Sequence, residues 1–489
     1  MRSTPTRHTF FLLLIFSFSF IATGLLAQKP LEEKIKQVEN NLYPLLQIED
    51  SVYRPSTIEQ RLKELGINGV SVAVINNYKL DWAKGYGMAD VKTNKPVIAP
   101  TLFLAGSISK SVNALGVLKL ADQKKMDLQE NINNYLRSWK FPEDSFSKNK
   151  KITIANLLSH SAGLSVHGFP GYTPGDSIPT VQQILDGQRP ANTAAVRSIF
   201  EPGVKFKYSG GGTTISQLIV SDVSGLPYEN YMQKEVLQPL GMNNSTYKQP
   251  YTKGNWENYA TAYYGDGKDV KGRFHVYPEM AAAGLWTNPT DLSKFIIETQ
   301  LSYAGKSKKI LSQNATKRML TFYVDSAVGL GVFFNKEGGK QFFSHGGADE
   351  GFRAFYFGSF EGGYGAIVMV NSDNGRIMNE IMSSIEIAYG WPKQNKVTKR
   401  KTIILPVDSL KKFTGKYYFD DGDSATVVLQ SDGLYINLNN ETSGKIYFTN
   451  FQSFFTFRYP YKMEFVKKED NSIDLHLTAG QLYIGRKKK

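Results

Sequence analysis

The chain has 489 residues, 41% of them hydrophobic and 13% aromatic, so it is long enough to bury a large core. It contains no cysteine, which excludes disulfides, thiolate zinc sites, a thiol nucleophile and the lipid-modified cysteine of a bacterial lipoprotein. The formal net charge is +14. Because the lysines are spread along the chain, this charge indicates attraction to anionic envelope polymers rather than to nucleic acid.

The first 27 residues are predicted to form a secretory signal peptide. Arg2 and Arg7 give a basic start, residues 10–20 are apolar, and small residues lead to a cleavage site after Ala27. The alternative is an uncleaved membrane anchor, since residues 9–27 are nearly long enough to span a bilayer. We therefore expect a secreted or periplasmic protein with no integral membrane span after cleavage.

Residues 28–395 are predicted to form one α+β domain. Strands before and after a helical middle indicate a single antiparallel sheet, flanked by helices and interrupted by an inserted helical subdomain. The expected elements, in chain order, are helices at 31–43 and 57–66, strands at 69–75 and 79–86, a helix at 107–124, helices within 125–320, strands at 328–334, 341–344, 352–359 and 364–371, and a helix at 376–389.

A second, all-β domain is predicted at residues 402–489, after a polar linker at 391–396. Its short strands follow one another closely and are separated by turn signals, which is typical of a small barrel or sandwich, and this pattern resembles a lipocalin-like domain. The expected strands lie at 415–419, 425–430, 434–438, 446–449, 454–458, 462–467 and 473–477.

The stretch LFLAGSISKSVNALGVLKL, residues 102–120, combines a Ser-x-x-Lys motif with an apolar helix. Ser107 lies at the expected N-terminus of this helix, where free N–H groups favour negative charge, and Lys110 follows on the same face. Four other Ser-x-x-Lys matches occur in the chain, but none of them opens a buried helix. The alternative is that Ser107 is an ordinary helix cap and Lys110 extends to solvent.

Further segments extend this pattern into a family resemblance. EPGVKFKYSGGG contains Tyr208–Ser209–Gly210, and FFSHGGADEGF contains His345–Gly346–Gly347. With LLSHSAGL, VLQPLGMNNSTY and AAAGLWTNPTDLSKF, they resemble the penicillin-recognising serine hydrolases, which include class C β-lactamases, DD-peptidases, D-aminopeptidases and related esterases. The resemblance covers about residues 55–390 and implies a β-lactamase/transpeptidase-like fold.

The resemblance implies catalytic roles for four residues. Ser107 would attack a carbonyl and form an acyl-enzyme, while Lys110 would take its proton. Burial of Lys110 against the helix would favour the neutral amine that this step needs. Tyr208 would hydrogen-bond Lys110 and Ser107 and pass the proton to the leaving group, and His345 would position Tyr208 across the cleft. The alternative is that Tyr208 and His345 are ordinary buried residues.

The resemblance also implies how substrate is held. The oxyanion hole would consist of the backbone N–H groups of Ser107 and Ala348. Gly346 and Gly347 would let the substrate backbone approach the strand closely. His160, in LLSHSAGL, is expected to be structural and to pin the inserted subdomain near the cleft.

Two departures from the family pattern affect the expected substrate. Gly210 stands where the family has an asparagine whose amide grips an acylamino group, so that contact is lost or supplied from elsewhere. His345 replaces a lysine, and a neutral imidazole holds a substrate carboxylate poorly. Arg353 is a candidate substitute cation, although it could also be a surface arginine. These differences favour an esterase, D-amino-acid amidase or peptidase over an efficient β-lactamase.

We therefore expect an exported serine hydrolase that cleaves an ester, amide or D-amino-acid peptide bond. The substrate would be a small molecule or peptide, including cell-wall fragments. The alternative is a catalytically weak or inactive envelope-binding protein on the same fold. The six histidines form no i,i+4 pair and no phosphate loop is present, so no metal or cofactor is expected. No oligomeric state is predicted.

Overall fold

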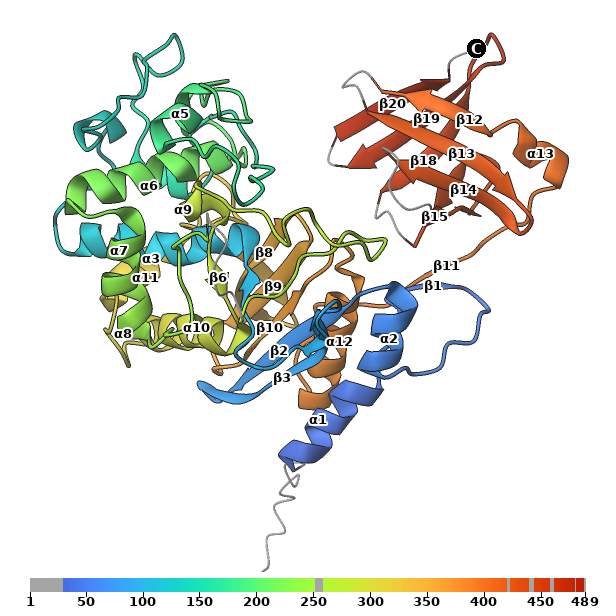
Figure 1. Cartoon of the computed structure of the whole chain (residues 1–489), viewed down its shortest axis with the longest axis horizontal. Helices are drawn as coiled ribbons and strands as arrows, with labels where there is room; N and C mark the ends of the chain where they lie inside the picture. Colours follow the sequence, from blue (N-terminus) through green and yellow to red (C-terminus); the bar gives the residue numbers. More distant parts are fainter. Residues whose placement is uncertain are drawn as a thin grey trace, which may run out of the picture.

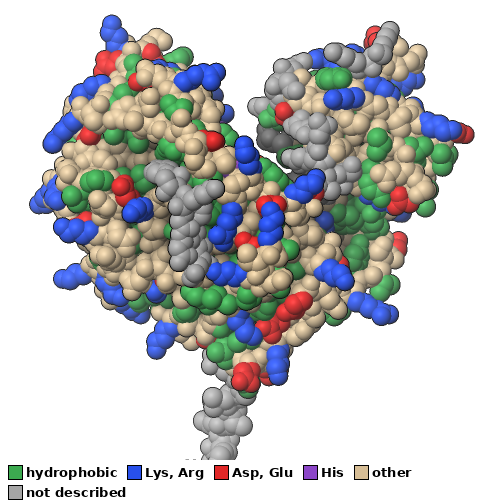
Figure 2. Space-filling view, in the orientation of Figure 1, with side chains coloured by type: hydrophobic (Ala, Val, Ile, Leu, Met, Phe, Trp, Pro, Cys, Tyr) green, Lys and Arg blue, Asp and Glu red, His purple; other side chains and the backbone are tan. Residues whose placement is uncertain are grey.

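The computed structural model contains a large α+β unit and a smaller β unit, joined by a short connection (Figure 1). The predicted signal peptide lies outside the described residues, among which no helix is long and apolar enough to cross a membrane. Lys and Arg side chains are scattered over the face shown in Figure 2 rather than gathered in one patch. The structure describes residues 30–250, 258–419, 423–438, 444–457, 461–479 and 481–487.

A seven-stranded antiparallel sheet, in the order β4-β3-β2-β10-β9-β8-β7, lies at the centre of the large unit. Strand β10 pairs with β2, so strands from before and after the helical middle meet in one sheet. The predicted α+β fold with an inserted helical subdomain is therefore confirmed. The strands are β2 (Gly69–Asn76), β3 (Lys79–Asp90), β4 (Lys95–Pro96), β7 (Phe333–Glu337), β8 (Lys340–Asp349), β9 (Phe352–Ser359) and β10 (Gly365–Val370).

Alternation along β2 directs apolar side chains into two separate cores. Val72 and Val74 pack in the core shared with α1 (Leu31–Asn40), α2 (Ile58–Leu65) and α12 (Arg376–Tyr389). Ala73 and Ile75 face the larger core on the other side of the sheet, which the inserted helices complete (Figure 1). The sheet is thus buried between two helical layers.

The insertion supplies the helices that surround the candidate site. The predicted helix at 107–124 starts later than expected, because Gly106 has a left-handed φ of +52° and Gly106–Ile108 form a 3₁₀ turn, η1. The α-helix α3 then runs from Ser109 to Asp122 and is buried along most of its length. The other helices are α4 (Ile154–Leu158), α5 (Val181–Asp186), α6 (Gly210–Ser224), α7 (Tyr228–Met232), α8 (Gln238–Leu240), α9 (Met280–Ala283), α10 (Pro289–Tyr303) and α11 (Gln313–Met319).

The strand expected at 328–334 is wrong. Val328 forms only an isolated bridge with Phe333, and the strand β7 begins at Phe333. Gly331 has a φ of +78°, and its N–H and C=O bond Leu158 and Ser111 instead of a neighbouring strand. These contacts turn the chain around the end of α4 before the ladder with β8 begins.

The smaller unit is a nearly closed nine-stranded barrel, in the order β15-β14-β13-β12-β20-β19-β18-β17-β16. Its two edge strands are consecutive parts of the chain, so residues 444–448 bring the ends of the sheet together. The last strand, β20, was not predicted, because Arg486 and Lys487 at its end suggest an exposed chain terminus. The strands are β12 (Gly415–Tyr418), β13 (Ser424–Gln430), β14 (Gly433–Leu438), β15 (Gly444–Lys445), β16 (Tyr447–Phe448), β17 (Ser453–Phe455), β18 (Lys462–Lys467), β19 (Ile473–Ala479) and β20 (Gln481–Lys487).

The connection between the units is itself partly ordered as a strand. Strand β11 (Thr398–Arg400) pairs in parallel with β1 (Leu46–Ile48). The basic segment that follows the predicted linker is therefore attached to the N-terminal part of the large unit (Figure 1).

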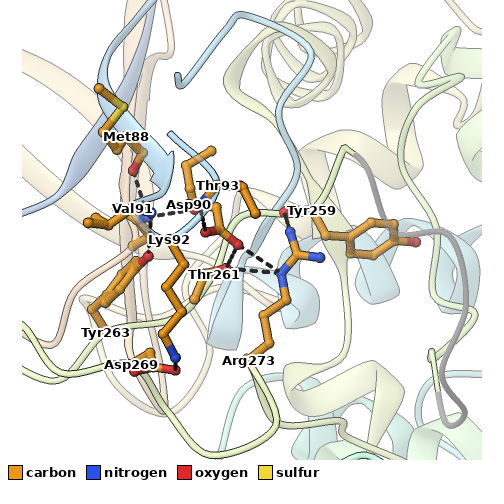
Figure 3. Close-up of polar contacts among 12 residues, drawn as sticks. Met88, Asp90, Val91, Lys92, Thr93, Tyr259, Thr261, Tyr263, Asp269 and Arg273 are labelled. Atoms are coloured by element: carbon orange, nitrogen blue, oxygen red, sulfur yellow. Dashed lines mark hydrogen bonds and ion pairs between the residues drawn. The ribbon is translucent and has the colours of Figure 1, made fainter. Parts of the chain in front are cut away.

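A polar cluster fastens the loop before α9 to the end of β3 (Figure 3). Thr261 Oγ1 donates a hydrogen bond of 2.8 Å to Asp90, and Arg273 lies 3.7 Å from the same carboxylate. Arg273 also donates to the carbonyl of Tyr259 at 2.6 Å. The cluster fixes the course of the chain that leads on to α9, beside the candidate site.

Candidate active site

Ser107 and Lys110 form a hydrogen-bonded pair at the start of α3. Lys110 Nζ donates to Ser107 Oγ at 2.9 Å and to the carbonyl of Ala282, in α9, at 2.7 Å. Lys110 is only 4% exposed, whereas Ser107 is the one residue from Thr101 to Lys110 that is not buried. The alternative of a capping serine and a solvent-directed lysine is wrong, since no side chain caps η1 or α3 and Lys110 points into the protein.

The second half of β8 offers an open edge beside Ser107. Strand β7 pairs with β8 only up to Ser344, so His345 and the residues after it pair with β9 alone. Close approach to η1 requires glycine at 347, because a Cβ there would lie 1.9 Å from the carbonyl oxygen of Ala105. At Gly346 a Cβ would meet nothing within 3.8 Å, since its nearest neighbour lies at 3.9 Å. Gly347 therefore serves the packing of η1, while Gly346 leaves free space on the strand.

The same close approach brings the two predicted oxyanion donors together. A Cβ on Gly106 would lie 2.5 Å from the backbone nitrogen of Ala348. The amide of Ser107, the next residue, is therefore a neighbour of the Ala348 amide. This arrangement suits two N–H groups that converge on one developing oxyanion.

Tyr208 is half-buried among aromatic rings between α6 and β8. Its ring centroid lies 4.2 Å from that of His160, 4.8 Å from that of His167 and 6.4 Å from that of His345. Lys110 Nζ lies 5.0 Å from the Tyr208 ring centroid. The expected hydrogen bond from Tyr208 to Lys110 or Ser107 is not present among the described residues, so Tyr208 meets Lys110 through its ring.

His160 has the position expected for a structural residue. It is 3% exposed and adopts a left-handed φ of +52°. Its Nδ1 accepts the backbone N–H of Ser209 at 3.2 Å. Burial, together with nearby Lys110, His345 and His167, lowers the pKa of His160 well below its usual value. A neutral His160 thus anchors the segment that carries Tyr208.

His345 is a buried, neutral imidazole with one free nitrogen. Its Nδ1 lies 2.6 Å from the carbonyl oxygen of Gly346, and a carbonyl only accepts, so Nδ1 carries the hydrogen. Nε2 is therefore a lone-pair acceptor, and it has no hydrogen-bond partner in the described part of the chain. Burial, and next the charge of Lys110, lower the pKa of His345 to about 3.

Two further carboxyl groups, those of Glu279 and Asp349, are buried near the site and interact with each other. Glu279 directly precedes α9 and is 0% exposed, and neither of its carboxyl oxygens has a partner among the described residues. Asp349 ends β8 and is 6% exposed. Burial raises the pKa of each to about 8. The charge of Asp349 adds to the shift of Glu279, whereas Lys110 and Arg353 oppose the shift of Asp349. Both are therefore neutral at pH 7.

Arg353, the candidate cation, is engaged within the protein. Its guanidinium donates to the carbonyls of Asp349 and Phe352 at 2.7 Å and forms an ion pair with Asp373 at 2.8 Å. Its contacts thus fasten the β8–β9 turn, and a direct contact between Arg353 and substrate stays a prediction.

Gly210 opens α6 beneath a strap formed by residues 165–169. A Cβ at Gly210 would lie 3.0 Å from both the carbonyl oxygen of His167 and the ring of Phe169. Ser209 caps the helix, with its Oγ accepting the N–H of Gly212. The space that an asparagine side chain would need at position 210 is therefore occupied by the strap.

The sequence analysis missed two residues of this site. Glu279 could have been noticed as a lone acidic residue in the apolar run VYPEMAAAGLW, and His167 as a histidine in a glycine- and proline-rich loop close to LLSHSAGL. Among the described residues, no group of three His, Asp or Glu side chains could hold a metal ion.

Comparison with known protein sequences supports this geometry. The profile of the Beta-lactamase family matches residues 55–381. The putative penicillin-binding protein PbpX of Bacillus subtilis is 27% identical over 312 residues, which cover 62% of this chain and 68% of PbpX. Protein flp of Staphylococcus aureus is 25% identical over 323 residues, which cover 64% of this chain and 61% of flp, less than two thirds of its length.

Solved structures show the same fold at lower identity. The octameric penicillin-binding protein homologue from Pyrococcus abyssi has a TM-score of 0.57 at 20% identity, over 87% of this chain and 98% of that one. D-Amino acid amidase from Ochrobactrum anthropi SV3, complexed with D-phenylalanine, has a TM-score of 0.57 at 21% identity, over 74% and 99%. Because the family profile spans well over half of its residues, the chain belongs to the Beta-lactamase family.

Proposed function

We propose that the protein is an exported serine hydrolase that forms an acyl-enzyme on Ser107. The observation that carries this proposal is the 2.9 Å hydrogen bond between an accessible Ser107 and a buried Lys110, in front of the open edge of β8. Export rests on the sequence of residues 1–27.

The acylation step follows from this arrangement. Ser107 Oγ attacks the substrate carbonyl while Lys110, acting as the general base, takes its proton. The amides of Ser107 and Ala348 stabilise the resulting oxyanion, and each such donor contributes about 2.7–4 kcal/mol to lowering the barrier.

Collapse of the oxyanion breaks the bond to the leaving group. The proton held on Lys110 then moves to the leaving oxygen or nitrogen by way of the Tyr208 hydroxyl. Tyr208 is a neighbour of Lys110, whose Nζ lies over its ring. Water then attacks the acyl-enzyme, gives one proton back to Ser107 and releases the acid. His345 Nε2, an unpartnered acceptor near Tyr208, would receive a hydrogen bond from the tyrosine hydroxyl and hold it in place.

The charges around the site favour esters and amides over substrates with a free carboxylate next to the leaving group. Neutral His345 has no positive charge with which to bind a carboxylate, and Arg353 is already bonded to Asp373. The fold similarity to a D-amino acid amidase supports D-amino-acid amides and peptides as members of this substrate class.

The test measures labelling by a fluorophosphonate probe and hydrolysis of p-nitrophenyl butyrate. Ser107→Ala should abolish both, and Lys110→Met should slow acylation by about 10²- to 10⁴-fold, as loss of a general base does. Ser145→Ala is the matched control, because it removes another Ser-x-x-Lys match, at an exposed position. Full activity of Ser107→Ala would overturn the proposal. A wild-type protein that neither labels nor hydrolyses would support a binding protein on this fold.

A further inference from the structure

We propose that His167 is a specificity-determining residue that binds an amide group on the acyl side of the substrate. This inference rests on the proposed acyl-enzyme function and names its substrate class: acyl groups that carry an amide next to the scissile carbonyl, such as N-acylated amino acids and peptides, rather than plain carboxylic esters.

The first observation is the path of the strap over the start of α6. The N–H of Gly210 donates to the carbonyl of His167 at 2.9 Å, and the N–H of Gly211 donates to that of Val166 at 3.1 Å. Ser209 Oγ donates to the carbonyl of Ser165 at 2.7 Å. The strap is therefore bonded to the residues that follow Tyr208, and His167 lies directly above Gly210.

The second observation is local backbone strain. Val166 has a φ of +60°, a left-handed conformation that a β-branched residue rarely adopts. Strain of this kind costs about 1–3 kcal/mol and persists only where the surroundings enforce it, which is common at functional sites. Here the hydrogen bonds to Ser209 and Gly211 enforce it. The left-handed conformation of Val166 sets the direction of the next residue, His167.

The third observation is the state of the imidazole itself. His167 is exposed, and its ring lies 4.8 Å from the ring of Tyr208. In the described part of the chain neither ring nitrogen is hydrogen-bonded, unlike His160 Nδ1, which binds Ser209. Burial and the nearby charges of Lys110 and Lys207 lower the pKa of His167. A neutral imidazole has one donor and one acceptor nitrogen, so it can either donate to the carbonyl or accept from the N–H of an amide.

His167 thus differs from the other two histidines at the site. His160 and His345 are each 3% exposed. His160 packs against Tyr208 and accepts the N–H of Ser209, and His345 lies on β8 and bonds the carbonyl of Gly346. His167 lies at the surface with both nitrogens available. Gly210 has no side chain that could hydrogen-bond substrate, but the neighbouring His167 has one.

The experiment compares kcat/KM for two esters, phenyl butyrate and the phenyl ester of N-acetylglycine, which differ by an amide in the acyl chain. In His167→Ala the preference for the acylamino ester should fall at least tenfold, while hydrolysis of the butyrate stays within threefold of wild type. His167→Asn, which keeps a donor and an acceptor, should recover part of the preference. His275→Ala is the control, because His275 is partly exposed and contacts the same loop at the carbonyl of Pro170.

Each outcome separates this inference from the proposed function. An unchanged preference in His167→Ala, with labelling of Ser107 intact, overturns the inference alone. An equal loss with both esters also overturns it, because His167 would then support the site in general. If the wild-type protein hydrolyses neither ester and Ser107 is not labelled, the proposed function fails and the inference fails with it.

Discussion

The two units of the molecule differ in their buried polar groups and in the residues that adopt a positive φ. In the barrel, Phe465 stacks on Phe413 and Phe454 at centroid distances of 4.3 and 4.7 Å, in a compact apolar core. Its described non-glycine residue with positive φ is Asn471, a residue type that tolerates this conformation in turns. The barrel follows ordinary rules of packing.

The large unit, by contrast, has unpartnered buried polar groups and backbone strain close to Ser107. Carboxyl oxygens of Glu279 and Asp349 and Nε2 of His345 are buried without a partner in the described chain. Val166, with its positive φ, lies in the same region. Such features reduce stability and persist where they are needed for function. Buried groups without a described partner also occur elsewhere in the large unit, for example in Asn68 and Gln394, so these features accompany the site that the motifs identify.

The first prediction tests the closest backbone contact at the site. Gly347→Ala places a Cβ 1.9 Å from the carbonyl oxygen of Ala105, so β8 and η1 must move apart. Both oxyanion donors are then displaced, and kcat/KM for an activated ester should fall by more than about 10⁴-fold, since each donor contributes about 2.7–4 kcal/mol. Gly346→Ala is the matched control, because a Cβ there makes only ordinary contacts at 3.9 Å and does not push β8 away from η1. Equal activity of the two variants would contradict this assignment.

The second prediction tests whether the barrel is a separate stabilising unit. Phe465→Ala removes a ring that is 1% exposed and stacked on two others, which should cost about 3–5 kcal/mol of barrel stability. Thermal unfolding followed by calorimetry should show an earlier transition for the barrel, while labelling of Ser107 below that temperature is retained. Loss of labelling in the folded variant would show that the barrel supports the active site.

The third prediction uses the opposite pKa shifts of two glutamates. Burial raises the pKa of Glu279 to about 8, so the folded protein favours its neutral form, and the stability this gives below the unfolded pKa is lost as the pH rises towards 8. Glu279→Gln keeps a neutral side chain at every pH. Relative to wild type it should gain about 3–4 kcal/mol of stability between pH 5 and pH 8.

Glu464, in the barrel, is the control with the opposite sign. A hydrogen bond from Ser453 and the neighbouring Lys462 lower its pKa, so its ionised form stabilises the barrel above the unfolded pKa. Glu464→Gln should therefore lose a little stability at both pH 5 and pH 8, since both lie above the usual glutamate pKa of about 4.3, and none at a pH below the folded pKa. Chemical denaturation at pH 5 and pH 8 measures both variants, and a loss of stability in Glu279→Gln at pH 8 would contradict the assigned burial effect.

The sequence predicted the sheet and the position of Ser107 well, because both depend on local patterns. Alternation in residues 69–75 and the apolar run after Ser107 identify a strand and a buried helix without knowledge of their partners. The motif residues Tyr208 and His345 were found because each lies in a distinctive short segment. The structure brings both to the Ser107–Lys110 pair.

Features that depend on long-range contacts could not be predicted. The role of His167 follows from hydrogen bonds between its strap and α6, about 40 residues later in the chain, and from the φ of Val166. Burial of Glu279 depends on packing between the insertion and β8. The last barrel strand was missed because Arg486 and Lys487 suggest a disordered end, whereas pairing with β12 and β19 orders them.

The smallest expected effect concerns the cluster that holds the loop before α9 (Figure 3). Burial acts to raise the pKa of Asp90, but hydrogen bonds from Thr261 and Thr93 and the charge of Arg273 outweigh it, so the pKa is lowered. Asp90 therefore stabilises the fold above the unfolded pKa, and this contribution is lost as the pH falls through the folded pKa. Asp90→Asn should lower the free energy of unfolding by about 1–3 kcal/mol at pH 7 and by much less near pH 3.

Asp269, in the same cluster, is the matched control, because its ion pair with Lys92 is solvent-exposed and such pairs contribute at most about 1 kcal/mol. Denaturant unfolding of Asp90→Asn and Asp269→Asn at pH 7 measures the difference. Because the loop leads to Glu279, Asp90→Asn should also reduce ester hydrolysis slightly, whereas Asp269→Asn should not. Equal effects of the two substitutions on stability would mean that the cluster is only a surface feature. The loop that precedes α9 would then not belong to the region that supports the active site, and that region would begin at α9.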